Sequence, residues 1–162
     1  MKKKIEAGGV IVSDNVAEQV YTSEEILRYI SQMKPLTKAS IAKYSQAPSL
    51  YEPAYNTMNE YERGVAQLFI EKGLLVYREV PIGTNGSTAD FYVYNPRSKK
   101  GKLVEVTLIQ QVYNPGDRQP SHKTRKRKGR QLVLLNATGM PFVVLYKENL
   151  ESIRKRLNRN LF

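Results

Sequence analysis

The sequence has 162 residues, enough for one compact domain, and its 41% of hydrophobic residues excludes a disordered chain. It contains no cysteine and a single histidine, His122, which excludes disulfides, thiolate zinc sites and zinc sites built on several imidazoles. The formal net charge is +11, and residues 97–130 hold 11 basic and 2 acidic side chains, which indicates either a nucleic-acid partner or a solvated basic face.

Residues 1–55 are predicted to form an arm and a helical hairpin. Residues 5–12 are short and apolar and read as an edge strand or an arm. Thr22 or Ser23 can cap a helix whose apolar residues share one face and which a proline ends. A second short helix over residues 36–44 makes the pair a candidate helix-turn-helix, although any small helical hairpin has the same pattern.

Residues 56–162 are predicted to form an α/β core. Thr57 and Glu60 have the spacing of a capping box, which opens a helix that Gly73 ends. The pattern then predicts, in chain order, strands over residues 74–80, 89–94 and 102–109, a helix over about residues 121–136, a strand over 142–146 and a helix over about 148–158. Three successive strands can form a meander, and a strand–helix–strand return adds a parallel neighbour, so we predict a mixed central sheet flanked by helices.

Two acidic residues interrupt strands that otherwise read as buried. Asp90 follows Ala89 in one strand, and Glu105 lies between valines in the next. Acids are depleted in strands and costly to bury unpaired. If the two strands are neighbours, the carboxylates can converge on one point, where Mg²⁺ or Mn²⁺ would neutralise them. The alternative is a pair of solvent-facing acids, or salt bridges to the many lysines.

An ordered set of motifs surrounds these acids. The motifs are Glu62-Arg63, Gly73, Arg78, Ala89-Asp90, Val104–Thr107, Gly129-Arg130 and Gly139–Lys147. Over roughly residues 57–150 the set resembles the archaeal Holliday-junction resolvases of the PD-(D/E)xK nuclease superfamily. The resemblance implies a restriction-endonuclease-like core and metal-dependent cleavage of DNA phosphodiesters.

The resemblance also implies a ligand set. Asp90, Glu105 and the carbonyl of Val106 would bind Mg²⁺ or Mn²⁺, and Glu62 would be a further ligand or hold a metal-bound water. The metal would lower the pKa of that water and stabilise the charge that develops on the phosphate. Glu60 competes with Glu62 for this role, although its expected position in the capping box favours capping.

Thr107 stands where the family has its catalytic lysine. Because threonine cannot supply a charge, either another lysine reaches the vacant space or the site binds nucleic acid or metal without cleaving. The candidates are Lys123, Lys126 and Lys102. Lys102 has the wrong strand parity relative to Glu105, which favours the two helix lysines.

The segment from His122 to Arg130 is the most basic part of the chain. Several of its cations share one helical face and could grip a phosphate backbone without reading bases, whereas His122 is expected to be a surface residue. Other expected contacts come from family positions. The predicted nucleic-acid contacts are Arg63, Arg78, Thr84, Ser87, Lys123, Arg125, Lys126, Arg127, Lys128 and Arg130.

The function predicted from the sequence is a metal-dependent endodeoxyribonuclease selective for junctions or other DNA structures. Cleaving a junction needs two nicks on opposed strands, so a homodimer is implied. One alternative is a non-catalytic DNA- or RNA-binding protein on a degenerate nuclease scaffold. Another is a nicking or transposition-type nuclease in which residues 20–46 form a targeting module.

The chain is predicted to be cytoplasmic and to have no membrane partner. Its longest apolar runs are too short to cross a bilayer, and the residues after Met1 do not form an apolar signal core. Many Lys and Tyr residues and no Cys fit a thermophilic source, including a virus or plasmid of such an organism.

Overall fold

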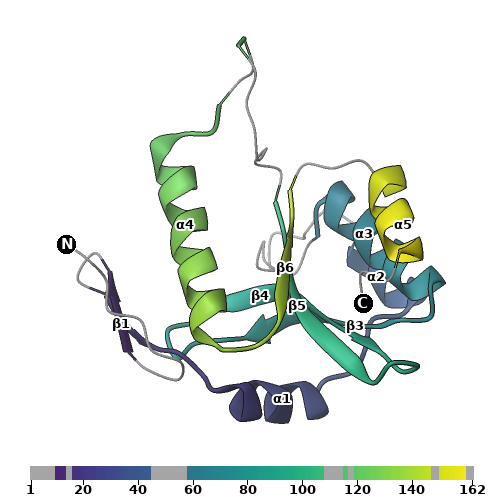
Figure 1. Ribbon diagram of the computed structural model, residues 1–162, viewed down its shortest axis with the longest axis horizontal. Helices are drawn as coiled ribbons and strands as arrows, with labels where there is room; N and C mark the ends of the chain where they lie inside the picture. Colours follow the sequence, from purple (N-terminus) through teal and green to yellow (C-terminus); the bar gives the residue numbers. More distant parts are fainter. Residues whose placement is uncertain are drawn as a thin grey trace.

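Figure 1 shows the computed structural model, which describes residues 10–13, 16–44, 58–107, 115–116, 119–146 and 150–159 of the chain. The strands and helices follow one another as β1 (Val10–Ser13), β2 (Val16–Gln19), α1 (Ser23–Ser31), α2 (Lys38–Tyr44), α3 (Glu60–Glu71), β3 (Leu75–Pro81), β4 (Thr88–Asn95), β5 (Lys100–Val106), α4 (His122–Ala137), β6 (Phe142–Leu145) and α5 (Leu150–Asn158).

The centre of the fold is a four-stranded sheet in the order β3-β4-β5-β6. β3, β4 and β5 are antiparallel neighbours, as short turns between successive strands allow. β6 pairs with β5 in parallel, after the chain has crossed over through α4. The predicted α/β fold with a mixed central sheet is therefore confirmed.

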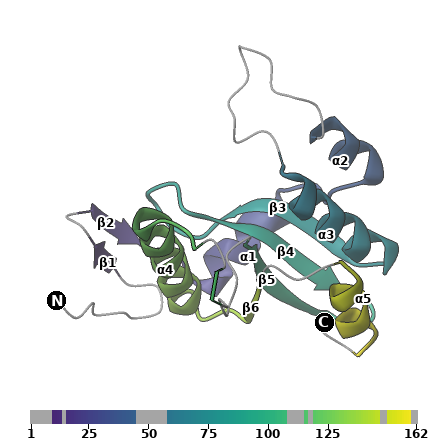
Figure 2. The same cartoon turned by 90° about the horizontal axis from the view of Figure 1, so that it is seen from above.

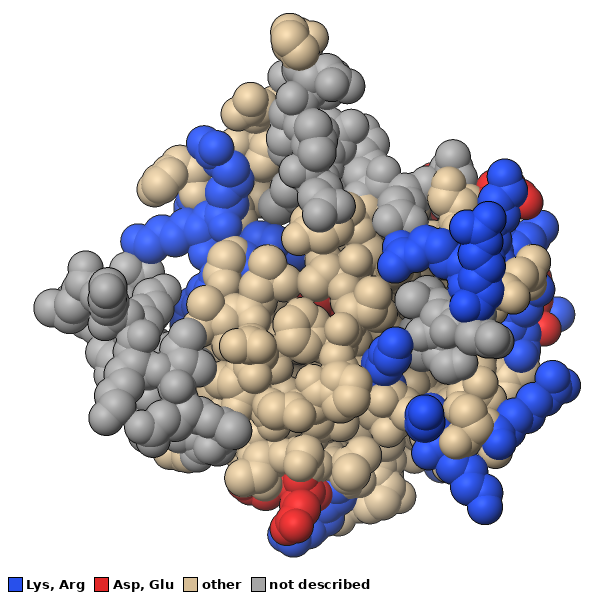
Figure 3. All heavy atoms as spheres, viewed as in Figure 1, with Lys and Arg blue, Asp and Glu red and all other residues tan. Residues whose placement is uncertain are grey.

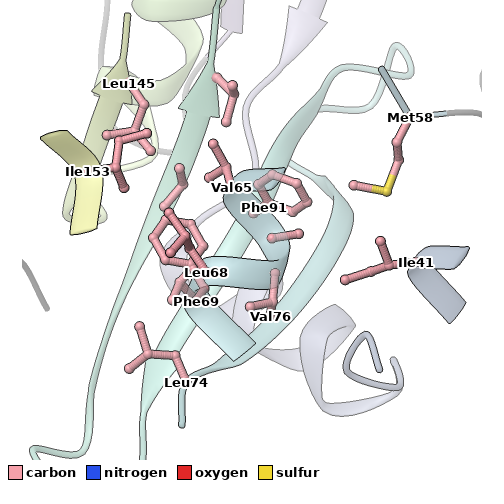
Figure 4. Packing of buried hydrophobic residues seen from close by; sticks show 14 residues of the cluster. Ile41, Met58, Val65, Leu68, Phe69, Leu74, Val76, Phe91, Leu145 and Ile153 are labelled. Atoms are coloured by element: carbon pink, nitrogen blue, oxygen red, sulfur yellow. The ribbon is translucent and has the colours of Figure 1, made fainter. Parts of the chain in front are cut away.

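Helices cover both faces of the sheet, because successive strand residues point to opposite sides. The α4 cluster contains the buried residues Val20, Ile26, Ile30, Val80, Ile82, Ala89, Tyr92, Leu103, Leu134, Leu135, Ala137 and Met140. The α3 cluster, which Figure 4 shows, contains Ile41, Met58, Val65, Ala66, Leu68, Phe69, Leu74, Val76, Phe91, Val93, Val104, Val106, Leu145 and Ile153. Figure 2 shows α4 on one side of the strands and α3 on the other. None of the helices in the described part of the chain is both long and apolar enough to span a membrane.

The start of α3 differs from the predicted capping box. Asn59 is the N-cap, so Glu60 is the first helical residue and not the third. The side chain of Asn59 accepts a hydrogen bond from the Glu62 amide at 2.8 Å and donates one to Glu62 Oε1 at 2.9 Å. The predicted capping box of Thr57 and Glu60 is therefore wrong. Asparagine is as good an N-cap residue as threonine, and Asn59 directly precedes the first helical residue. Thr57 itself lies outside the described residues.

The two N-terminal helices are part of the core. Ile26 and Ile30 of α1 are buried in the α4 cluster, whereas Ile41 of α2 is buried in the α3 cluster. Between them the amide of Leu36 donates to the carbonyl of Val76 at 2.7 Å, at the β3 edge of the sheet. The helices thus pack on opposite faces of one sheet, which is not the arrangement of a helix-turn-helix, where the two helices pack together.

Truncating Ile26 to Ala should destabilise the whole protein. The side chain is fully buried, so its loss should lower the free energy of unfolding by about 2–5 kcal/mol. Leu27→Ala is the matched control, because Leu27 is 45% exposed and its loss should change stability by about 0.5 kcal/mol or less. Urea denaturation of both variants measures the difference, and equal midpoints would show that α1 is peripheral. By the same reasoning, deleting residues 1–46 should unfold the core and not merely change targeting.

Candidate active site

Asp90 and Glu105 meet where β4 and β5 separate. The last described pair of the two strands is Phe91 with Val104, so Asp90 and Glu105 come next on either side. The amide of Asp90 donates to Glu105 Oε2 at 3.4 Å, and the amide of Val106 donates to Asp90 Oδ2 at 2.7 Å. The Asp90 side chain thus takes the place of a ladder bond, and the two acids converge as the sequence predicts.

The pKa of Asp90 is strongly raised at this point. Burial raises the pKa of Asp90 to about 8, and the neighbouring carboxylate of Glu105 adds to the rise. The hydrogen bond from Val106 opposes it. In the absence of a cation Asp90 therefore keeps its proton at neutral pH, which is a way of avoiding two adjacent negative charges.

Glu62 faces the same acids from the first turn of α3. Burial raises the pKa of Glu62; Arg78 opposes the rise, and the carboxylates of Glu79 and Glu105 reinforce it. Its Oε1 is held by the side-chain amide of Asn59. Glu62 is therefore close enough to sense Glu105, as the resemblance implies, although no hydrogen bond between the two is described.

Glu79 is a further acid at this point, and sequence reasoning missed it. Arg78 pairs with Phe91 and Val80 pairs with Ala89, so Glu79 lies opposite Asp90 on β3. Its φ of 54° is left-handed, which is uncommon for a residue other than glycine. The kink changes the strand's parity, since Val76 packs in the α3 cluster and Val80 in the α4 cluster. Nothing in the local sequence signals such a kink.

A lysine does reach the carboxylates, and it comes from α4. Lys128 Nζ lies 2.9 Å from Glu105 Oε1, in an ion pair that is largely buried on both sides. Gln131, one helical turn further on, donates to the Thr88 carbonyl and lies 3.4 Å from Glu105 Oε2. Lys128 therefore occupies the position for which the sequence favoured Lys123 or Lys126.

Those other candidates lie elsewhere. Lys123 and Lys126 are exposed in the first half of α4, and neither has a described bond to Glu105. Lys102 lies opposite Val93 on β4, away from the strand ends that carry the acids. Thr107 is buried beside Glu105 and lines the pocket next to it.

A pocket of about 930 Å³ opens beside Glu105 and Lys128. Its walls come from the start of α3, the turn before β4, the end of β5 and the face of α4 that carries Lys128 and Gln131. The lining residues are Asn59, Gly86, Ser87, Thr88, Glu105, Val106, Thr107, Gln119, Pro120, Thr124, Arg127, Lys128 and Gln131. This volume is within the range of small-molecule sites and is large enough for part of a polymer backbone.

Several predicted nucleic-acid contacts are engaged in the fold. Arg63 Nη1 donates to the carbonyl of Met58, and Arg78 lies 4.7 Å from the ring centroid of Tyr44. Thr84 bonds to the backbone of β2 through Gln19. These contacts favour a structural role for all three predicted residues, and a phosphate would have to compete with the present partners.

Four cations of α4 are exposed at the surface. The exposed residues are Lys123, Arg125, Lys126 and Arg127, and Arg127 also lines the pocket. Arg130 is different, because it pairs with Glu18 at 3.0 Å. Figure 3 shows Lys and Arg side chains over α4 on the left, and a second group on the right, where Figure 1 places α5. The surface beside the acids is therefore positively charged.

The residues present fit a divalent cation that keeps part of its hydration shell. Mg²⁺ is usually held in proteins by one or two carboxylates, completed by waters and substrate phosphates. Asp90 and Glu105 supply two such carboxylates, and Glu105 lines an open pocket. Within the residues that the structure describes, no three His, Cys, Asp or Glu side chains form a metal site, so water, phosphate or the Val106 carbonyl would complete the shell.

Comparisons of this chain with protein-family models, with curated proteins and with solved structures find no match.

The raised pKa of Asp90 predicts how stability depends on pH in the presence of a chelator. Between its unfolded value of 3.8 and its folded value of about 8, the folded carboxyl binds a proton that the unfolded one releases. The free energy of unfolding should therefore fall as pH rises through this window, by on the order of 2 kcal/mol between pH 5 and 7. Asp90→Asn should lack this contribution. Urea denaturation of both proteins in EDTA tests it, and an equal pH dependence would show that Asp90 ionises normally.

Proposed function

We propose that this chain is a divalent-metal-dependent endonuclease that hydrolyses DNA phosphodiesters at the pocket beside Glu105. The observation that carries the proposal is the convergence of two carboxylates, Asp90 and Glu105, with the ammonium of Lys128 2.9 Å from the second. The pKa of Asp90 is raised to about 8 next to a pocket that Glu105 lines, and an acid with a strongly perturbed pKa beside a cleft is typical of a reactive site.

Each group has a role that its position supports. Asp90 and Glu105 hold the cation, and Mg²⁺ or Mn²⁺ bound there would activate a water and neutralise charge on the phosphate. Lys128 supplies the positive charge that Thr107 cannot, and it is free to turn from Glu105 to a phosphate oxygen once a cation neutralises the acid. Glu62 can accept a proton through the oxygen that Asn59 does not hold.

A second candidate function is nucleic-acid binding without cleavage. The observation in its favour is that Lys128 already compensates Glu105, so the site is electrostatically satisfied without a metal. In that case the basic face of α4 would bind a backbone, and the acids would only stabilise the fold.

A cleavage assay separates the two functions. Labelled four-way junction, duplex and single-stranded DNA, and a single-stranded RNA, are incubated with the full chain and Mg²⁺ or Mn²⁺, with EDTA as the control. The proposal expects metal-dependent cleavage of at least one DNA. Binding to these substrates with no cleavage of any of them would leave the second function. Paired nicks on a junction would in addition imply a homodimer.

The exposed cations of α4 should set affinity without setting sequence preference. Replacing Lys123 and Arg127 together with Ala should weaken DNA binding similarly for unrelated sequences and reduce the salt slope by about 2, one for each lost phosphate contact. The control with the same loss of charge is Lys34→Ala with Lys38→Ala, two exposed residues outside α4. Equal salt slopes for the two double variants would discard α4 as the binding face.

A further inference from the structure

Glu18 on β2 is a buried acid that the proposed chemistry does not use. It is 1% exposed, and its carboxylate is surrounded by donors. Oε2 accepts from Arg130 Nη2 at 3.0 Å and from Ser87 Oγ at 2.8 Å. Oε1 accepts from the amides of Asn85 at 3.1 Å and Ser87 at 3.3 Å. Four donors, from the 83–87 turn and from α4, thus hold this carboxylate in one position and connect the two segments through it.

The elements that Glu18 joins are two walls of the pocket. On one side, the turn at residues 83–87 leads into the lining residues Ser87 and Thr88. On the other side, Arg130 sits on α4 between the lining residues Lys128 and Gln131. Glu18 itself is not among the lining residues, so it acts on the pocket only through its partners.

The backbone seats Glu18 firmly against the turn. The amide of Tyr21 donates to the Ile82 carbonyl at 3.0 Å, and the amide of Thr84 donates to the Gln19 carbonyl at 2.9 Å. A Cβ on Gly83 would lie 2.4 Å from Glu18 Oε1, so only glycine leaves space for the carboxylate. Among the described residues Arg130 Nε has no hydrogen-bond partner, and the pairing of Nη2 with Glu18 orients the guanidinium.

We infer that Glu18 is a positioning residue of the site: it fixes the 83–87 turn relative to α4, and thereby fixes where Lys128 and Gln131 hold Glu105. Strand β2, which pairs with β1 and carries Glu18, then helps to set the shape of the pocket. The catalytic consequence rests on the proposed function, whereas the coupling of the two walls does not.

Glu18→Gln tests the inference, because it keeps the shape but removes the charge that Arg130 needs. Hydrogen exchange of the full chain should speed up by about tenfold in both residues 83–87 and residues 127–131, beyond any change in the central strands. The turnover number for DNA cleavage should fall by about tenfold or more with affinity for DNA nearly unchanged, since small displacements of catalytic groups act on chemistry. Val65→Ala, which opens the α3 cluster on the other face, should lower the melting temperature without this pattern.

Three results would overturn the inference. Exchange that rises in only one wall, or no more than in Val65→Ala, would show that Glu18 does not couple the walls. Unchanged turnover of a nuclease-active chain would show that the coupling does not matter for chemistry. If Glu18→Gln does not fold, Arg130→Lys decides by the same readouts, since it keeps the charge but loses the guanidinium geometry. If the wild type cleaves nothing, the proposed function fails, and the exchange comparison still tests the coupling.

Discussion

Asp90→Asn and Glu105→Gln are each expected to abolish metal-dependent cleavage, lowering the turnover number by about a thousandfold or more. Each substitution keeps the size of the side chain and removes one of the two carboxylates that meet where β4 and β5 separate, where the Asp90 amide lies 3.4 Å from Glu105 Oε2. A single remaining carboxylate should bind the divalent ion more weakly, because the second negative charge helps to offset the cost of removing water from the ion.

The loss must be separated from unfolding. Because the pKa of Asp90 is raised to about 8, Asp90→Asn removes an unfavourable ionisation, so this variant should be at least as stable as the wild type near pH 8. Glu60→Gln is the matched control, since Glu60 is an exposed acid of α3 that has no place among the converging carboxylates. Cleavage that survives in both site variants, or is lost equally in Glu60→Gln, would reject the assigned acids.

Lys128→Ala is expected to lower the turnover number by about a hundredfold while leaving the affinity for Mn²⁺ unchanged or higher. The ammonium competes with a cation for Glu105 in the resting site, at 2.9 Å, so removing it favours metal binding. The variant also lacks the ammonium that would stabilise the charged phosphate during the reaction, so the turnover number should fall. A residue that only stabilises the fold would not be expected to lower the turnover number while the affinity for Mn²⁺ stays the same or rises.

Two further variants sharpen this test. Lys123→Ala removes an exposed charge from the same helix and should leave the turnover number within about threefold, because its contacts are to the backbone of the substrate. Thr107→Lys in the Lys128→Ala background places a lysine at the end of β5, beside Glu105, and should restore part of the activity. Full activity of Lys128→Ala would show that the cation of this site comes from another residue.

The central parts of the fold and site were predictable because local pattern and burial agree there. Apolar runs bounded by turn residues predicted the three strands that prove to be antiparallel, and Asp90 and Glu105 were noticeable because each is an acid within an apolar strand. A pattern of this kind can be recognised in the sequence because it depends only on residues that are adjacent in the chain, and not on contacts with distant segments.

The missed features depend on contacts between distant segments. Glu18 sits in a short polar strand, and its partner Arg130 is 112 residues away, so no local pattern marks it. The left-handed backbone of Glu79 lies opposite Asp90 on the neighbouring strand, and no turn residue in the sequence marks it. The choice of Lys128 over its neighbours depends on the rotation of α4 about its own axis, which is set by Leu134 and Leu135 packing in the α4 cluster.

The N-terminal helices show the same limit. Each was predicted within a few residues of its place, since Thr22 does cap α1 together with Glu25. Their assignment to a separate helical module failed to anticipate that Ile26 and Ile41 are buried on opposite faces of the sheet. The amphipathic pattern of a short helix says that one face is covered, but not what covers it.

A crystal structure of the full chain grown with Mn²⁺ at about pH 8, where Asp90 can lose its proton, tests the shared cation most directly. We predict an anomalous peak about 2–2.5 Å from one oxygen of Asp90 and one of Glu105, with Lys128 Nζ displaced from its partner. Saturating Mn²⁺ with no peak between these acids, and Lys128 still paired with Glu105, would contradict the account.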